Sequence, residues 1–279
     1  MRLCLPPMTS RPDPAPPSPA SSPVPEAPEQ ASLRRSPLPA KGAKLSEDNQ
    51  PPSEQIQREV LEAHRAYPPR QISFGKRAFD VSLALAGIVL SSPAWVLFSL
   101  LIWLEDPGPL FFVKNSVGQG GINFRQFKFR SMVREAEKGT GPVLAEQTDA
   151  RVLRIGKLMR KTALDELPQL VNILKGEMSF VGPRPQRTVL VRNYLLEMPE
   201  YAERHLVPPG IAGLAQVAAN YYITPRQKLR FDQLYVRHAG LGFDLRLLAI
   251  AFLLVFYLRW KPGWDGRLPR AWLRRNQWC

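Results

Sequence analysis

The most regular feature of the chain is one long run of apolar positions, from Val81 to Leu104, which predicts a membrane helix. The run holds 24 residues without a charge, and about 20 apolar residues are enough to cross a bilayer. Ser92 and Pro93 lie near its centre, where proline removes a backbone hydrogen bond and bends a helix. The run predicts a spanning helix or a re-entrant helix that bends at Pro93, with a buried helix of a soluble protein as the third alternative.

The charges that flank this run bear on the side of the membrane from which it starts. Lys76 and Arg77 precede it, whereas Glu105 and Asp106 follow it. Because basic residues are enriched on the cytoplasmic side of membrane helices, we expect the run to begin in the cytoplasm. If the chemistry encoded downstream also needs the cytoplasm, the re-entrant path is favoured, because it returns the chain to the same side.

Beyond this run, shorter patterns predict a mixed α/β domain in which helices predominate. Leu110 to Val113 and Ile122 to Phe129 have the character of strands, and the glycine turn at 118–121 between them predicts a hairpin. Helical patterns and turns rich in glycine and proline follow, the helices at 151–162, at 166–175 and near 186–197, and the turns at 181–185 and 208–210. The predicted fold class is α/β and mostly helical.

The N-terminal part differs in composition from this central domain. Residues 1–52 are rich in proline, serine and alanine, and they hold too few large apolar residues to offset the entropy of ordering. We therefore expect them to be disordered. Ile56, Val60 and Leu61 share one helical face, which predicts a short surface helix from Ser53 to about Tyr67.

The C-terminal part begins with a second apolar run. Leu245 to Leu258 is apolar apart from Arg246, which is short for a membrane span and predicts an interfacial or packed helix. The basic, tryptophan-containing tail that follows suits an anionic membrane surface, although a solvated tail fits the pattern equally well. The predicted divisions of the chain are 1–52, 53–72, 73–106, 107–245 and 246–279.

Composition narrows the classes of ligand. The net charge of +14 indicates anionic partners, which are phosphates, anionic lipids or nucleic acids. The two cysteines, Cys4 and Cys279, exclude a disulfide framework and a cysteine-based zinc site, and they fit a reducing compartment. The three histidines are far apart in the sequence, so oxygen ligands would hold any metal, and Mg²⁺ is the natural candidate.

Two adjacent carboxylates, Asp165 and Glu166, stand out in the segment from Arg160 to Gly176. Proline is tolerated in the first turn of a helix, so Pro168 predicts a helix that starts near Asp165 and ends at Gly176. The apolar side chains of this helix predict its buried stripe, which comprises Leu167, Leu170, Val171 and Leu174. Asp165 would then be the cap or lie one position from it, which leaves a purely structural role open. Neighbouring side chains lie about 100° apart on a helix, so the two carboxylates would take different roles.

Several cations occur in the same part of the sequence. Arg160 precedes Asp165 by five residues, and Arg184 lies between two prolines, which stiffen the backbone that presents its guanidinium. Lys128 and Arg130 add further positive charge. Each cation alone could be a surface charge. Carboxylates among cations, without histidine or cysteine, indicate phosphoryl transfer with a divalent metal rather than acyl transfer or zinc hydrolysis.

These residues also carry a family resemblance that runs from Lys76 to about Asp244. The shared motifs, in order, are KRAFD, a Ser-Pro in the apolar run, GPLFF, FKFRSM, DARVLRIGKLMRKTALDELPQLVNILKGEMSFVGPRP and PGIAGLAQV. The chain resembles the monotopic phosphoglycosyl transferases, which form the bacterial sugar transferase family. The resemblance implies that 107–245 is a compact, membrane-associated catalytic domain with interfacial helices. It also implies that the segment 73–106 before this domain is a re-entrant membrane helix, broken at Ser92-Pro93.

The resemblance also implies a reaction. Asp165 matches the nucleophile that attacks the β-phosphorus of a UDP-sugar, releases UMP and forms a covalent phosphosugar-aspartyl intermediate, and it matches the position that contacts Mg²⁺. Polyprenyl phosphate, such as undecaprenyl phosphate, then accepts the sugar-1-phosphate. Glu166 matches the second member of the pair, which positions or deprotonates the lipid phosphate. Arg160 and Arg184 match phosphate-binding positions.

The resemblance further implies a location and partners. UDP-sugars and Mg²⁺ are cytoplasmic, so the expected place is the cytoplasmic face of the bacterial inner membrane, with other glycan-assembly enzymes as further partners and no nucleic acid. The chain departs from the family pattern at 114–118, at Ala212 and at 218–220. These departures leave the two carboxylates in place and leave the identity of the sugar open.

Two alternatives compete with this interpretation. A non-catalytic, membrane-anchored basic protein that binds anionic lipid or nucleic acid would explain the charge and the apolar run, although it leaves the LDELPQL and GPRP motifs unexplained. Another metal-dependent phosphotransferase or an inactive homologue is the second alternative. Release of UMP from a UDP-sugar would separate a catalytic protein from a non-catalytic one.

Overall fold

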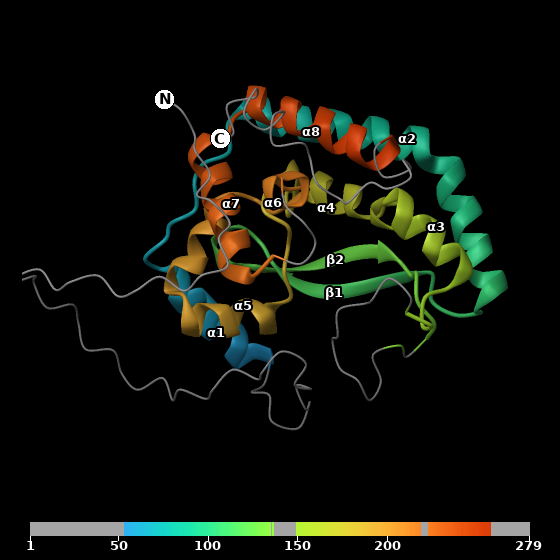
Figure 1. Ribbon diagram of the computed structural model, residues 1–279, viewed down its shortest axis with the longest axis horizontal. Helices are drawn as coiled ribbons and strands as arrows, with labels where there is room; N and C mark the ends of the chain where they lie inside the picture. Colours follow the sequence, from blue (N-terminus) through green and yellow to red (C-terminus); the bar gives the residue numbers. More distant parts are fainter. Residues whose placement is uncertain (1–52, 135, 137–148, 219–222, 258–279) are drawn as a thin grey trace, which may run out of the picture. The chain divides into compact units, whose positions relative to one another are not determined.

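The computed structural model describes residues 53–134, 136, 149–218 and 223–257 (Figure 1). The predicted disorder of 1–52 and the predicted basic tail lie outside the described residues. The regular elements, in chain order, are α1 (Ser53–His64), α2 (Phe74–Glu105), β1 (Phe111–Val117), β2 (Asn123–Phe129), α3 (Arg154–Thr162), α4 (Gln169–Lys175), β3 (Ser179–Val181), α5 (Thr188–Glu197), β4 (Gly210–Ala212), α6 (Leu214–Ala218), α7 (Pro225–His238) and α8 (Leu241–Phe256). The described part is therefore mostly helical, as predicted, and it contains two small sheets.

The predicted membrane helix is present as α2, which continues through Pro93 as one helix of 32 residues. The Ser73 hydroxyl caps its start by accepting a hydrogen bond from the Lys76 backbone N–H at 3.3 Å. Figure 1 shows that the helix changes direction between its two ends. Within the described residues, α2 is the one helix long and apolar enough to cross a membrane, and most of its central side chains are exposed. Its path in a membrane stays a prediction.

Both halves of α2 pack on the rest of the described domain, each through its own apolar cluster. Ala84 in the first half contributes to a cluster with α4 and β2, whose other buried members are Phe124, Leu170, Ile173 and Met178. Phe98 and Ile102 in the second half contribute to a cluster with β2 and α3, whose other buried members are Phe129, Leu153 and Met159. The helix therefore has one packed face and one exposed apolar face.

The predicted hairpin is confirmed, with a longer first strand than expected. β1 and β2 pair antiparallel in a register that runs from Phe111↔Phe129 to Val117↔Asn123. A short 3-10 turn joins them, in which Gly120 and Gly121 take positive φ angles of 65° and 81°. A Cβ atom at Gly121 would lie 2.7 Å from the ring of His64. This tight turn seats the hairpin against the end of α1.

The helix predicted to start near Asp165 begins later, which corrects the prediction that Asp165 caps it. Ala163 takes the left-handed conformation (φ 58°, ψ 17°) and ends α3, so the chain folds Leu164–Glu166 into a 3-10 turn before α4 starts at Gln169. No side-chain cap is formed there by Asp165 within the described structure. Gly176 (φ 86°) ends α4 as predicted.

The buried face of α4 also differs from the predicted stripe. Leu170 is buried as expected, whereas Leu167, Val171 and Leu174 are only partly buried. The fully buried positions include Asn172, whose side-chain amide donates to the Arg125 carbonyl at 2.7 Å and whose Oδ1 accepts from Phe127 N–H at 3.1 Å. A polar residue thus fastens α4 to the edge of the hairpin, and an apolar pattern cannot reveal such a contact.

A second, parallel sheet joins two segments that the sequence predicts as turns. β3 pairs with β4 through Ser179↔Gly210 and Val181↔Ala212. The strands approach so closely that a Cβ atom at Gly210 would lie 2.0 Å from the backbone nitrogen of Gly182. The turn predicted at 181–185 therefore follows β3, and the turn predicted at 208–210 leads into β4. The sheet fixes the start of the Gly182–Pro185 segment.

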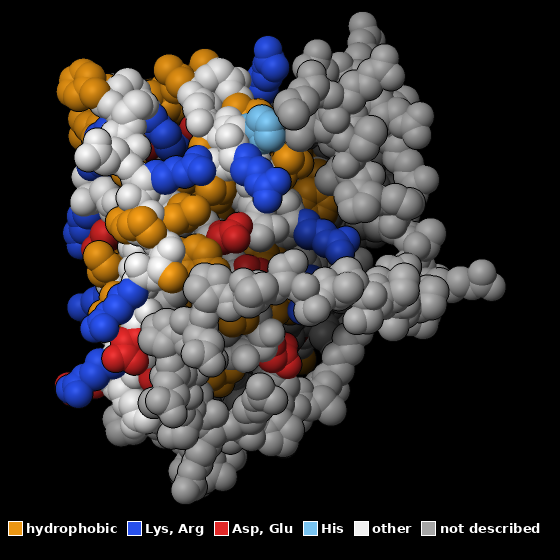
Figure 2. Space-filling model, turned by 90° about the vertical axis from the view of Figure 1, so that its left-hand side faces the viewer, with side chains coloured by type: hydrophobic (Ala, Val, Ile, Leu, Met, Phe, Trp, Pro, Cys, Tyr) orange, Lys and Arg blue, Asp and Glu red, His pale blue; other side chains and the backbone are white. Residues whose placement is uncertain are grey.

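The two terminal helices of the described region have different surroundings. The helix predicted from Ser53 is present as α1, but its apolar face is packed, with Ile56 and Val60 buried against α5 and the segment that follows it. The apolar helix predicted near the C-terminus is present as α8 and starts at Leu241. Leu245, Phe252 and Leu253 on α8 are exposed. On the side drawn in Figure 2, hydrophobic side chains gather at the upper edge, with lysines and arginines below them.

Candidate active site

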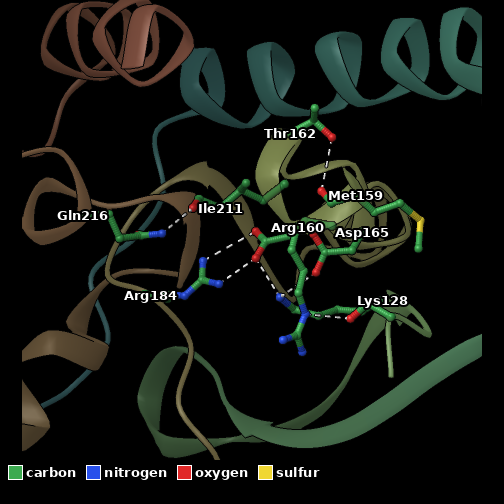
Figure 3. Close-up of polar contacts among 10 residues, drawn as sticks. Lys128, Met159, Arg160, Thr162, Asp165, Arg184, Ile211 and Gln216 are labelled. Atoms are coloured by element: carbon green, nitrogen blue, oxygen red, sulfur yellow. Dashed lines mark hydrogen bonds and ion pairs between the residues drawn. The ribbon is translucent and has the colours of Figure 1, made fainter. Parts of the chain in front are cut away.

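Asp165 and Glu166 lie side by side in the 3-10 turn between α3 and α4, and both side chains are largely buried, with 8% of each residue exposed. The turn exists because Ala163 ends α3 in the left-handed conformation, which allows Leu164–Glu166 to fold back before Pro168 and α4. Figure 3 shows Lys128, Arg160 and Arg184 converging on this turn from other elements. The structure therefore brings together five of the residues that the sequence singles out.

Glu166 is bound tightly by two cations. The Lys128 ammonium on β2 donates to Oε1 of Glu166 at 2.6 Å, and the Arg184 guanidinium donates to the same oxygen at 2.6 Å. Arg184 also lies 3.5 Å from the second carboxylate oxygen. This carboxylate thus holds the two cations in position, and they in turn hold it ionised.

Asp165 is much less constrained. Among the ion pairs of the described residues, its carboxylate takes part in one, with the Lys128 ammonium at 3.9 Å. This distance is too long for a hydrogen bond. Since Lys128 is already bonded to Glu166, the Asp165 carboxylate keeps oxygen lone pairs available for a ligand.

The two carboxylates differ in acidity as a result. Burial works to raise the pKa of Glu166, but Arg184 and Lys128 outweigh it and hold that pKa well below its usual range. Burial raises the pKa of Asp165 above its usual value, although Lys128 lowers it in part, and the neighbouring charge of Glu166 raises it further. A permanently ionised carboxylate therefore stands beside one whose charge depends on its surroundings.

Arg160 and Arg184 are positioned by contacts away from the carboxylates. The Arg160 Nε donates to the Ser131 hydroxyl at 2.9 Å, which ties the last turn of α3 to the end of β2. The backbone carbonyl of Arg184 accepts a hydrogen bond from the buried Arg204 at 2.7 Å. Arg204 is itself paired with the buried Asp232 at 2.9 Å. Both arginines are therefore anchored while their side chains face the carboxylate turn.

Three other predicted residues lie elsewhere. Arg130 binds Asp106 at the end of α2, with Nη1 and Oδ2 3.1 Å apart, so its guanidinium is not directed at the carboxylate turn. Ser92 and Pro93 lie on the exposed face of α2, where the Ser92 hydroxyl donates to the Val89 carbonyl at 2.8 Å. Their proposed roles in phosphate binding and in breaking the helix are untested by these contacts.

Two further cations near this site, Lys114 and Arg187, are not among the residues predicted from the sequence. The positive charge of Arg187 repels the Lys114 ammonium, whereas the carboxylate of Glu166 attracts it. Arg187 also lies over the ring of Phe112, with its Cζ 5.9 Å from the ring centroid. Alternation along β1 could have revealed Lys114, because it lies two residues from Phe112 on the same face of a strand. No comparable signal exists for Arg187, which reaches the site through tertiary packing.

The carboxylates fit a partial metal site rather than a complete one. The described residues contain no group of three or more His, Cys, Asp or Glu side chains that could hold a metal. Mg²⁺ commonly binds one or two protein carboxylates and completes its coordination with water and substrate phosphates. Asp165, with its available lone pairs, is suited to be such a ligand, whereas Glu166 is already occupied by cations.

Comparisons with known proteins agree with the motifs. The family model described as "Bacterial sugar transferase" matches residues 71–257. A UDP-N-acetylgalactosamine-undecaprenyl-phosphate N-acetylgalactosaminephosphotransferase from Aeromonas hydrophila is 42% identical over 179 residues, which cover 63% of this chain and 42% of that protein. The chain thus spans less than half the length of this relative.

Two further relatives are matched over more of their own length. A UDP-glucose:undecaprenyl-phosphate glucose-1-phosphate transferase from Caulobacter vibrioides is 38% identical, with coverage of 65% of this chain and 69% of that protein. An exopolysaccharide production protein from Rhizobium leguminosarum bv. phaseoli is 35% identical, with coverage of 62% and 90%. In all three, the matched region is similar in extent and the sugar or product that the name specifies is not the same.

Proposed function

Because the chain belongs to the bacterial sugar transferase family, we propose that it moves a sugar-1-phosphate from a UDP-sugar to polyprenyl phosphate and releases UMP. The names of two relatives specify undecaprenyl phosphate as acceptor, and they specify different sugars. The product, a polyprenyl diphosphate-sugar, would be the first intermediate of a glycan or exopolysaccharide and a substrate for later glycan-assembly enzymes.

The observation that carries this proposal is the difference between the two buried carboxylates. Glu166 is held by Lys128 and Arg184 at 2.6 Å each, whereas Asp165 has a single ion pair at 3.9 Å. A nucleophile needs an unshared oxygen lone pair, so Asp165 is suited to attack. An attack on a phosphate also needs neutralisation of the surrounding negative charge, which the nearby lysine and arginines would supply.

The proposed reaction has two steps. In the first, an Asp165 carboxylate oxygen forms a bond to the β-phosphorus of the UDP-sugar, and the bond from that phosphorus to the oxygen bridging the two phosphates breaks, which releases UMP. In the second, an oxygen of the polyprenyl phosphate attacks the same phosphorus, and the bond to Asp165 breaks. Glu166 keeps Lys128 and Arg184 in place for the phosphate oxygens, and through these cations it orients the incoming lipid phosphate. Its low pKa makes it a weak base, so orientation rather than deprotonation is the proposed role.

Mg²⁺ is part of the proposal. It would bind Asp165 together with substrate phosphate oxygens and water, and when bound it would withdraw negative charge from those oxygens. The ring of arginines and Lys128 would do the same from the protein side, because their positions are fixed before substrate binds.

For α2 we propose the re-entrant path, with both ends at the cytoplasmic face. The helix begins with the Lys76 ammonium 2.5 Å from Asp244 and ends with the Glu105 carboxylate accepting from the Arg154 and Ile155 backbone N–H groups, at 2.5 and 3.0 Å. Both ends are therefore fastened to the domain that carries the two carboxylates. A straight span of 24 residues covers about 36 Å and would separate these ends by a bilayer core of about 30 Å.

The exposed apolar side chains of α2 and α8 support the same arrangement. Val89, Leu90 and Val96 on α2 are at least 70% exposed, and Phe252 on α8 is 65% exposed. Side chains of this kind are stable in lipid and costly in water. We propose that the outer face of α2 enters the inner membrane and that α8 lies at its surface, which brings the site to the level of the lipid phosphates.

The reaction is tested by measuring UMP release from the protein in lipid nanodiscs with Mg²⁺, undecaprenyl phosphate and a panel that includes UDP-glucose and UDP-N-acetylgalactosamine. We expect UMP in amounts equal to the lipid-linked product with at least one donor. A trapped protein-phosphosugar adduct, found by mass spectrometry when the lipid is omitted, would support the covalent step. Absence of UMP with every donor would instead favour a non-catalytic lipid-binding protein.

The path of α2 is tested by labelling single cysteines in a variant without Cys4 and Cys279. Phe74→Cys precedes the apolar part of α2, and Val133→Cys follows it, and both native side chains are exposed. The re-entrant path predicts that an impermeant thiol reagent labels both from the cytoplasmic side of inverted vesicles. Labelling from opposite sides would establish a spanning helix.

A further inference from the structure

Lys114 occupies a position on the hairpin that faces the candidate active site. In the register of the two strands, Lys114 pairs with Gln126, and Lys128 pairs with Phe112. Side chains on alternate positions share a face, and diagonal neighbours on such a face lie about 7–8 Å apart. Lys114 and Lys128 are therefore diagonal neighbours on one face of the hairpin, and Lys128 is bonded to Glu166.

A second cation, Arg187, lies over the same face. Its backbone pairs with that of Ser116 in a single antiparallel β-bridge, and its guanidinium lies over the ring of Phe112. Ser116 and Phe112 are the two nearest neighbours of Lys114 on the same face of β1. Lys114 is thus enclosed between Arg187 and Lys128, with Arg184 also acting on it. Among the described residues, the negative group that acts on it is Glu166, which is already shared by Lys128 and Arg184.

Within the described residues, the charges that act on Lys114 are mainly positive. Lys128, Arg184 and Arg187 repel its ammonium, and Lys114 takes part in none of the ion pairs within 4.0 Å found in the described part of the chain. Bringing like charges together in a half-buried site is costly unless an anion joins them. The arrangement is therefore complete when a phosphate group is present.

We propose that Lys114 is a further substrate-binding residue, whose ammonium contacts a phosphate oxygen beyond those reached by Lys128 and Arg184. This inference rests on the proposed transfer reaction and specifies its binding site. A phosphate oxygen could come from the diphosphate of the nucleotide-sugar or from the polyprenyl phosphate. The two sources share one chemistry, and steady-state kinetics with each substrate varied in turn separates them.

The surroundings of Lys114 also link binding to pH. Burial, followed by the charges of Lys128, Arg184 and Arg187, lowers the pKa of Lys114 to about 7, and Glu166 raises it only in part. A phosphate beside the ammonium adds negative charge and raises that pKa, so substrate binding takes up a proton at pH values above about 7. The diphosphate of a nucleotide-sugar keeps its charge between pH 6 and 9. A pH dependence of the KM for the UDP-sugar in this range therefore comes from the protein, and Lys114 is the group expected to cause it.

The first experiment compares Lys114→Met, Lys114→Arg and the wild type in steady-state kinetics. Lys114→Met should raise the KM of one of the two substrates by about tenfold or more, because a hydrogen bond to a charged group is lost. Arginine keeps the charge, so Lys114→Arg should stay within about threefold of the wild type. Lys157→Met is the matched control, since Lys157 is an exposed lysine of α3.

The pH dependence separates substrate contact from a purely structural role. In the wild type, the KM of the affected substrate should rise as pH increases from 6 to 9, whereas Lys114→Arg and Lys114→Met should lack this component. If Lys114→Met leaves both KM values and their pH profiles at the wild-type level, the inference is wrong. If Lys114→Arg is as impaired as Lys114→Met, the lysine acts in packing and the inference is also wrong.

Equilibrium binding of UDP, measured by calorimetry without lipid substrate, keeps this inference separate from the transfer reaction. Weaker UDP binding by Lys114→Met than by Lys157→Met would support the contact with the nucleotide even if no UDP-sugar yields UMP. Equal UDP binding combined with equal equilibrium binding of polyprenyl phosphate in nanodiscs would contradict it, whatever the wild-type turnover.

Discussion

Two buried groups of charged side chains in this protein differ in how completely they are paired. In the first, the Lys76 ammonium lies 2.5 Å from Oδ2 of Asp244, and the Tyr235 hydroxyl lies 2.9 Å from Oδ1. In the second, Glu166 is saturated by two cations while Asp165 keeps available oxygens. The first group joins α2 to α8 and leaves no polar atom of the aspartate for a ligand. The second is incomplete, which is the property expected of a site that reacts.

The largest effect is expected from Asp165→Asn. The amide keeps the shape of the side chain but cannot attack phosphorus, so UMP release should fall by about 10⁴-fold or more. The melting temperature should change little, because the Asp165 carboxylate makes only a long contact with Lys128. Retention of more than a few per cent of the wild-type rate would show that another group is the nucleophile.

Glu166→Gln should have the next largest effect. The glutamine cannot neutralise Lys128 and Arg184, which should lose their fixed positions, and we expect turnover to fall by about 100-fold or more. Single-turnover measurement of UMP release, without lipid acceptor, should be less affected than the complete reaction if Glu166 serves mainly the lipid phosphate. Equal loss in both measurements would assign it to the first step as well.

Asp244→Asn tests the saturated group, and its effect should fall on stability rather than on chemistry. The variant removes the carboxylate that is paired with the buried Lys76 ammonium, which should cost about 3 kcal/mol in the free energy of unfolding. Turnover per folded molecule should remain within about threefold of the wild type. A large loss of turnover without a loss of stability would mean that the two groups do not differ in the way described above.

The last prediction is a pH dependence of stability that comes from Lys114. Burial and neighbouring cations lower its pKa from an ordinary 10.5 to about 7, so the folded protein binds this proton less tightly than the unfolded chain does. Stability is therefore lost progressively as pH falls from about 10 to about 7, and no further loss from this group occurs below that range. Lys114→Met should remove this slope from chemical unfolding curves, and an unchanged slope would contradict the prediction.

The periodic elements could be predicted from the sequence because their patterns depend on local contacts. The long apolar run, the hairpin and the helices at α3 and α5 follow directly from the spacing of apolar residues. The start of α4 could not, because Ala163 adopts the left-handed conformation that glycine usually takes. The two three-residue strands are also beyond such patterns, since their pairing depends on the close approach of Gly182 and Gly210.

The site was predicted in part for a similar reason. The carboxylate pair and Arg184 lie in motifs whose composition is unusual enough to be noticed in the sequence. Lys114 and Arg187 are ordinary basic residues, and they become part of the site only when β1 and the start of α5 are folded together. The motif of Arg130 also suggested the site; its side chain binds Asp106 at the end of α2, and its role in phosphate binding stays a prediction.

The position of α1 has a consequence for how the protein can be shortened. The region similar to the family begins at residue 71, yet Ile56 and Val60 are already buried in a shared apolar cluster. The ring of His64 also fills the space beside Gly121 and lies 2.9 Å from a nitrogen of His205. A truncation placed at the family boundary would uncover this interior, so the smallest stable fragment should begin before α1 rather than where the recognisable similarity begins.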